Sequence, residues 1–128
     1  MSAVAIIGVA GIVKRPFCTL LCCLPQTWNW RNTGRIYDFV TCTEVAEYFH
    51  QPSREFRRLD ALLRPGGWLA LMTCFQSDDT RFADWHYRRD PTHVVFYREA
   101  TLRRLAGRHG WHCEIPCPNV ALMRKESA

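Results

Sequence analysis

The sequence predicts an α/β domain in which helices flank a mostly parallel sheet and an antiparallel hairpin closes the C-terminus. Segments 36–42 and 68–74 are rich in apolar, β-branched and aromatic residues at both parities, as in strands covered on both faces. A helical apolar pattern lies between them, and such strand-helix-strand units normally form parallel pairs with a right-handed crossover. Two short apolar runs around the turn 116–119 are typical of a hairpin.

Composition limits the classes of partner. The chain has 128 residues, of which 48% are hydrophobic and 23% charged, so it can build a globular core. The net charge is +5, but the basic residues are scattered among acids and form no run that tracks a phosphate backbone. Lys14-Arg15-Pro16 interrupts the apolar N-terminus well short of the ~20 residues that a membrane span needs. We expect neither a nucleic-acid nor a membrane partner.

Cysteine usage favours a reducing, cytoplasmic location. The chain has 7 cysteines, an odd number, and some lie inside apolar strand-like runs. The nearest approaches to metal-ligand spacing are Cys18 with Cys22 and Cys23, and His112-Cys113 with Cys117. Neither contains a CxxC pair, so we predict no metal site.

A change in composition predicts a boundary near residue 34. Residues 1–34 contain no acid, and we interpret them as an atypical segment of strand plus linker before an α/β domain at 35–128. Within this segment Ala3 to Val9 has the pattern of a buried strand. We expect it to pair with strand 36–42, because the intervening residues suffice for one crossover. The alternative is that another copy of the chain fills that strand edge.

The next elements follow from periodicity. A short helical or turn segment is expected at 43–50, and a surface helix at about 54–63 with one apolar stripe, formed by Phe56, Leu59, Leu62 and Leu63. Pro65-Gly66-Gly67 is predicted to end this helix, because proline cannot continue it and glycine accepts a left-handed closing geometry. A second helix is expected from Glu99 to a stop at Gly110. The tail 125–128 is predicted to fray.

A long segment without periodicity separates the second strand from the second helix. Residues 75–97 sustain neither a helical nor a strand period, and loops of this length usually bind a ligand or form a lid. Ligands of parallel sheets bind beyond the carboxyl ends of the strands, which here are 41–47 and 73–77. The loop carries many rings, from Phe75, Phe82, Trp85, His86, Tyr87, His93, Phe96 and Tyr97.

Three motifs carry a resemblance to a known family. The stretch 37–48 (YDFVTCTEVAEY), the stretch 62–67 (LLRPGG) and Gly110-Trp111 resemble the C-terminal half of class I S-adenosylmethionine-dependent methyltransferases, over about residues 36–125. Trp85-His86-Tyr87, 90–93 (DPTH) and Phe96-Tyr97 are similar to a bacterial subgroup with small-molecule acceptors. The resemblance implies a partial Rossmann-like sheet, in which 36–42 and 68–74 are the fourth and fifth strands.

The resemblance also implies a cofactor, S-adenosylmethionine, and a small-molecule methyl acceptor. Cofactor contacts would come from Thr43, Glu44 and Val45. The acceptor side would be formed by Phe75, Gln76, Trp85, Tyr87 and Tyr97. If the reaction needs a base, His93 and His86 are the candidates, since an unperturbed imidazole titrates near neutral pH. The alternative is that the rings only hold the loop on the sheet and that Glu44 and Glu47 are solvated helix charges.

Two departures from the family pattern leave the function open. The glycine-rich first loop and the acidic residue after the second strand have no counterpart in residues 1–34. Relatives also commonly carry histidine where this chain has Tyr48. The sequence therefore supports a shortened methyltransferase with impaired cofactor binding, or a non-catalytic remnant that acts as an interaction or homodimerisation module. An RNA-associated domain would need a contiguous arginine face, which the sequence does not show.

Overall fold

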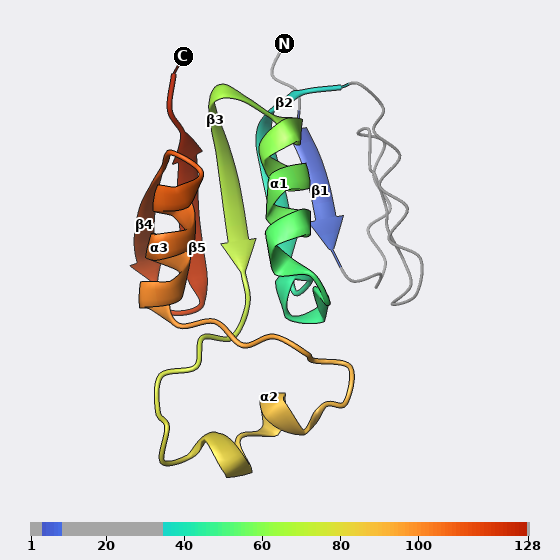
Figure 1. The fold of residues 1–128 in the computed structure, drawn as a ribbon, viewed down its shortest axis with the longest axis vertical. Coiled ribbons are helices and arrows are strands. Elements are labelled where there is room, and N and C mark those ends of the chain that lie inside the picture. Colours follow the sequence, from blue (N-terminus) through green and yellow to red (C-terminus); the bar gives the residue numbers. More distant parts are fainter. Residues whose placement is uncertain (1–3, 9–34, 128) are drawn as a thin grey trace.

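One sheet organises the described part of the chain. The computed structural model describes residues 4–8 and 35–127. Here five strands form one sheet in the order β1-β2-β3-β5-β4 (Figure 1). The strands are β1 (Val4–Gly8), β2 (Tyr37–Thr43), β3 (Leu63–Met72), β4 (Trp111–Cys117) and β5 (Val120–Lys125).

The pairing confirms the α/β class and the predicted N-terminal pair, but not a mostly parallel sheet. β1 pairs in parallel with β2, with Val4 opposite Phe39 and Gly8 opposite Thr43. β2 and β3 are also parallel, whereas β5 is antiparallel to both β3 and β4. Because the hairpin inserts β5 next to β3, antiparallel pairings are as frequent as parallel ones among the described strands. The remainder of the predicted segment 1–34 lies outside the described residues.

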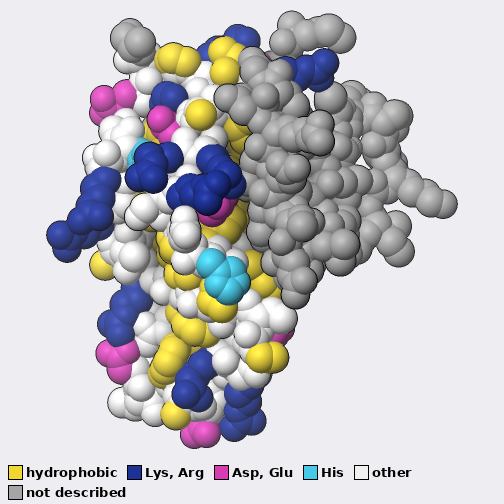
Figure 2. Space-filling view, turned by 45° about the vertical axis from the view of Figure 1, so that its right-hand side comes forward, with side chains coloured by type: hydrophobic (Ala, Val, Ile, Leu, Met, Phe, Trp, Pro, Cys, Tyr) yellow, Lys and Arg dark blue, Asp and Glu magenta, His cyan; other side chains and the backbone are white. Residues whose placement is uncertain are grey.

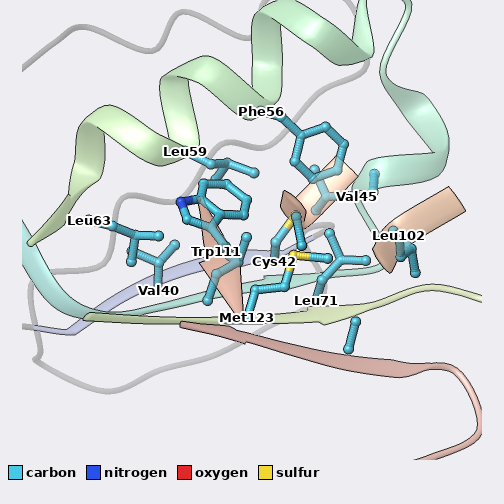
Figure 3. Close-up of a cluster of buried hydrophobic side chains, with 14 of the residues drawn as sticks. Val40, Cys42, Val45, Phe56, Leu59, Leu63, Leu71, Leu102, Trp111 and Met123 are labelled. Atoms are coloured by element: carbon cyan, nitrogen blue, oxygen red, sulfur yellow. The ribbon is translucent and has the colours of Figure 1, made fainter. Parts of the chain in front are cut away.

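Two helices cover one face of the sheet. They are α1 (Pro52–Leu62) and α3 (Glu99–Arg108), both in front of the strands in Figure 1. Figure 3 shows Phe56 and Leu59 of α1 above Val40 and Leu71 of the sheet. All four side chains are fully buried. Each such side chain contributes about 1.5–3 kcal/mol of transfer free energy. No helix in the described ranges is long and apolar enough to cross a membrane.

The Pro-Gly-Gly segment is not the stop of α1, which corrects the sequence prediction. The helix ends at Leu62, and Leu63 already pairs with Tyr37. Arg64–Gly67 then forms an insertion within β3, opposite a single residue of β2. Gly66 has φ +80°, and a Cβ on Gly67 would lie 2.8 Å from the carbonyl oxygen of Arg64. Gly66 is therefore required by its positive φ, and Gly67 by the close approach of the backbones of β2 and β3. Neither glycine is required to end the helix.

The C-terminal hairpin is confirmed, with a longer first strand and a better anchored end than expected. β4 continues to Cys117, so the turn is Pro118-Asn119, with Asn119 at φ 69°. Gly110 ends α3 at φ 67°, as predicted. The prediction of a frayed tail is wrong at Lys125, whose Nζ lies 3.2 Å from the Asp60 carboxylate. Asp60 also accepts a 2.9 Å hydrogen bond from Nε1 of Trp111, so α1 holds both strands of the hairpin.

Substituting Gly67 by alanine tests the backbone contact. We expect Gly67→Ala to lower the free energy of unfolding by about 1–3 kcal/mol, because the new methyl group meets three carbonyl oxygens within 3.2 Å. Gly107→Ala in α3 is the matched control. A Cβ there meets nothing within 4 Å, so this variant should be more stable by up to about 1 kcal/mol. Urea unfolding measures both, and equal effects of the two substitutions would contradict the proposed contact.

Candidate active site at the carboxyl ends of β2 and β3

The chain turns sharply where β2 ends. Thr43, the last residue of β2, lies opposite Met72, the last residue of β3. The next residue, Glu44, has φ 53°, a left-handed conformation that is uncommon for glutamate. Its backbone N–H donates to the Met72 carbonyl at 2.8 Å, which holds the turn. Backbone strain of this kind is concentrated at functional sites.

A second carboxylate lies beneath this turn. Glu47 belongs to the short helix η1 (Ala46–Tyr48) and is fully buried. Its Oε2 accepts a 2.9 Å hydrogen bond from the hydroxyl of Thr73, just after β3. Its Oε1 has no hydrogen-bond partner among the described residues. The expectation that Glu47 is a solvated helix charge is therefore wrong.

The long loop closes over these carboxylates. It contains the short helices η2 (Phe82–Asp84) and α2 (His86–Arg89), and it lies beyond the lower end of the sheet in Figure 1. The Tyr87 hydroxyl donates to Glu44 Oε2 at 3.3 Å and lies 3.0 Å from the Thr73 hydroxyl. Burial raises the pKa of Tyr87, so its phenol remains a neutral donor at physiological pH.

The main chain fastens the same loop. The carbonyl of Glu47 accepts hydrogen bonds from the N–H groups of Val94 (2.8 Å) and Val95 (3.2 Å). The hydroxyl of Tyr97 donates to the Ala46 carbonyl at 2.9 Å. The loop is therefore anchored on the segment that follows β2.

The two glutamates perturb each other. Partial burial raises the pKa of Glu44, and the neighbouring Glu47 carboxyl raises it further. The Tyr87 hydroxyl and His93 act in the opposite direction. Glu44 therefore holds a proton more readily than an ordinary glutamate does.

His93 is almost enclosed by the loop that carries it. Its side chain is 8% exposed, and Nδ1 lies 2.8 Å from the Tyr87 carbonyl. Nε2 lies 3.3 Å from the Tyr48 hydroxyl and 3.5 Å from the Asp90 carboxylate. Tyr48 of η1 thus contacts the histidine supplied by the loop. The other predicted base, His86, is exposed on α2.

Three of the five predicted acceptor residues lie together. Phe75, Gln76 and Trp85 line a pocket of about 270 Å³ with Ser77, Asp78 and Arg81. The other two, Tyr87 and Tyr97, are buried, and their hydroxyls anchor the loop as described above.

The predicted cofactor residues are less uniform in their surroundings. Glu44 is exposed and Thr43 half-buried, whereas Val45 is fully buried in the hydrophobic core. Sequence reasoning missed Thr73 and the contact of Tyr48 with His93. The signal for Thr73 was its position directly after an apolar strand.

Comparisons with known proteins identify the family. A profile of the methyltransferase domain matches residues 16–114, so the chain belongs to the methyltransferase domain family. A search of curated proteins finds no match.

Solved structures share the fold. An O-methyltransferase family protein from Burkholderia thailandensis matches with TM-score 0.58 and 20% identity over 75% of this chain. YcgJ from Bacillus subtilis matches with TM-score 0.58 and 17% identity over the same share. A protein described as possibly exported, from Bordetella parapertussis, matches with TM-score 0.52 and 16% identity over 73% of this chain. The chain spans only 32–42% of the length of these structures.

The raised pKa of Glu44 predicts a pH dependence of stability. Between its ordinary value of 4.5 and its raised pKa, the folded chain holds this proton and the unfolded chain loses it. The contribution of Glu44 to stability therefore falls as pH rises through this interval. As pH rises from 4.5 to 7, we expect the melting temperature of the Glu44→Gln variant to fall less than that of the parent chain. Comparing the two melting curves cancels the other titrating groups, and identical pH slopes would contradict the shift.

The hydroxyl of Tyr87 should hold the loop closed. We expect Tyr87→Phe to reduce the free energy that holds the loop on the strand ends by about 1 kcal/mol. The open form of the loop would then be about fivefold more populated, and cleavage within residues 75–97 roughly fivefold faster. Limited trypsin digestion read by mass spectrometry at Arg88 and Arg89 measures this rate. Tyr37→Phe, at the opposite end of β2, is the matched control and should leave cleavage at these sites unchanged. Equal rates in the parent and Tyr87→Phe would show that the hydroxyl does not fasten the loop.

Proposed function

We propose that this chain forms the acceptor-side part of an S-adenosylmethionine-dependent methyltransferase with a small-molecule acceptor. The observation that carries the proposal is the polar cluster of Glu44, Glu47, Thr73 and Tyr87 at the carboxyl ends of β2 and β3. Ligands of α/β sheets bind beyond these ends, and the chain belongs to the methyltransferase domain family.

The residues present fit the cationic end of this cofactor. S-adenosylmethionine supplies a methyl group carried by a positively charged sulfur. Glu47 keeps one buried carboxylate oxygen without a described partner, and Glu44 adds a second, partly exposed carboxylate. Negative charge at this position favours a bound cation, since Coulomb attraction is strong where water is scarce. Of the three predicted cofactor residues, Thr43 and Glu44 would hold the cofactor, with the carboxylate of Glu44 as the main contact, whereas Val45 is fully buried in the core and would only support the turn.

Besides binding the cofactor, the protein must position the acceptor, exclude water and accept a proton. Alignment matters most in an in-line displacement, and the pocket of Phe75, Gln76 and Trp85 offers an aromatic wall for the acceptor. The loop 75–97 would exclude water. For an acceptor hydroxyl, Glu44 would be a proton acceptor, since partial burial and the neighbouring Glu47 raise its pKa above that of an ordinary glutamate. His86 is exposed and free to act in this way, whereas both nitrogens of His93 already have partners.

A second function remains as the alternative, an interaction or homodimerisation module derived from a methyltransferase. Two observations favour it. The chain spans 32–42% of the length of the solved structures that it resembles, and its first 34 residues lack a glycine-rich cofactor loop. Such a module would self-associate or bind a partner without binding the cofactor.

Isothermal titration calorimetry with S-adenosylmethionine distinguishes the two functions. We expect weak binding, because the glycine-rich loop has no counterpart, and about tenfold weaker binding in Glu44→Ala, which corresponds to roughly 1.4 kcal/mol. Glu114→Ala on β4, remote from the strand ends, is the control and should bind like the parent. No heat from either S-adenosylmethionine or S-adenosylhomocysteine would refute cofactor binding. Self-association seen by sedimentation velocity in that case would support the module.

A further inference from the structure

We propose that the groove between α1 and α3 binds an acidic, amphipathic helical segment of a partner protein. The groove has a volume of about 380 Å³ and is lined by residues of both helices. Three arginines line it, Arg57 from α1 and Arg104 and Arg108 from α3. Its lining also includes Leu105, which is half-buried and accessible, and Phe56, whose side chain is fully buried. None of these residues belongs to the cluster at the strand ends, so the groove is a separate site.

The arginines of the groove differ from their neighbours on the same helices. Arg58 pairs with Glu55 at 3.1 Å, and Arg103 pairs with Glu99 at 2.8 Å. In contrast, the side chains of Arg57, Arg104 and Arg108 have no ion pair or hydrogen bond with any described residue. No aspartate or glutamate lines the groove. Positive charge is therefore collected here without an internal counter-charge.

The spacing of these charges suits a helical ligand. Thr101, Arg104 and Arg108 lie on successive turns of α3, so the two arginines are about 6 Å apart along the helix axis. Like charges four residues apart destabilise a helix unless a ligand neutralises them. Acids at positions i and i+4 of a partner helix repeat with the same spacing. Apolar residues on the same face of that helix would contact Leu105, which is half-buried and packs against the core.

The groove is less suited to RNA. Single-stranded nucleic acid binds through exposed aromatic faces on which bases stack. Phe56 is fully buried, and the His109 ring at one end of the groove already stacks on Trp111, with ring centroids 4.6 Å apart. Figure 2 shows hydrophobic surface exposed between Lys and Arg side chains on the helix-bearing side of the molecule. This combination of charge and apolar surface favours an acidic peptide.

Fluorescence anisotropy with a designed peptide tests the proposal on the full chain. The probe is a labelled 15-residue alanine-based helix with Glu and Leu on one face, and the control probe has Gln in place of Glu. We expect binding of the Glu peptide only. The variant Arg57→Gln/Arg104→Gln/Arg108→Gln should bind at least tenfold more weakly. The matched control Arg58→Gln/Arg64→Gln/Arg103→Gln removes the same charge from arginines that pair with Glu55, Asp38 and Glu99, and should stay within twofold of the parent.

Three outcomes would overturn the proposal. An equal loss in both triple variants would indicate non-specific attraction to net charge, and equal binding of the Gln peptide would exclude carboxylate recognition. Tighter binding of a 12-nucleotide single-stranded RNA, lost in the groove variant, would assign the groove to RNA. Reversing the charge of two groove arginines distinguishes a loss of binding from a loss of folding, because an unfolded variant would bind neither peptide. Arg104→Glu/Arg108→Glu should bind a Lys version of the peptide in place of the Glu version, and failure to do so would contradict the proposed geometry.

Discussion

The described structure depends on one buried acidic residue, Glu47, which joins the sheet to the long loop. Its side chain accepts a hydrogen bond from Thr73 at the end of β3, and its main-chain carbonyl accepts two from the loop at Val94 and Val95. An apolar residue at this position could not accept the hydrogen bond from Thr73. The position of the loop, and with it the acceptor pocket, therefore depends on the segment that follows β2, which binds β3 through the Glu47 carboxylate and the loop through the main-chain carbonyls of Ala46 and Glu47.

Burial of such a group has an energetic consequence. Removing a carboxylate from water costs several kcal/mol unless hydrogen bonds or opposite charge offset that cost. Thr73 satisfies one oxygen of Glu47, whereas the other has no partner among the described residues. The nearby Glu44 increases the local negative charge, and its raised pKa is the expected response. Two neighbouring carboxyl groups in this position are suited to stabilise a bound cation.

The fold separates two kinds of surface. At the carboxyl ends of the parallel strands, acids and aromatic rings gather under a loop, as expected for a small-molecule site. On the helical face, α1 and α3 leave a groove lined by arginines and by apolar side chains. The first surface has negative charge and the second positive charge. The scattered arginines of the sequence thus become a local feature only when two helices lie side by side.

The sequence by itself determined the strands and the two longer helices, because apolar periodicity and glycine positions are local properties. The short helices η2 and α2 of the loop and the early start of β3 at Leu63 were not predicted. It also predicted the N-terminal strand pair and the hairpin, which the structure confirms, and it predicted a site at the strand ends. Only the tertiary structure decided that Pro65-Gly66-Gly67 lies inside β3 and that Lys125 is held by Asp60, since both depend on contacts between distant segments. The same holds for the burial of Glu47 and for the arginine groove. Whether a charged residue faces water or the interior is decided by what packs against it, and the periodicity of a short segment does not contain that information.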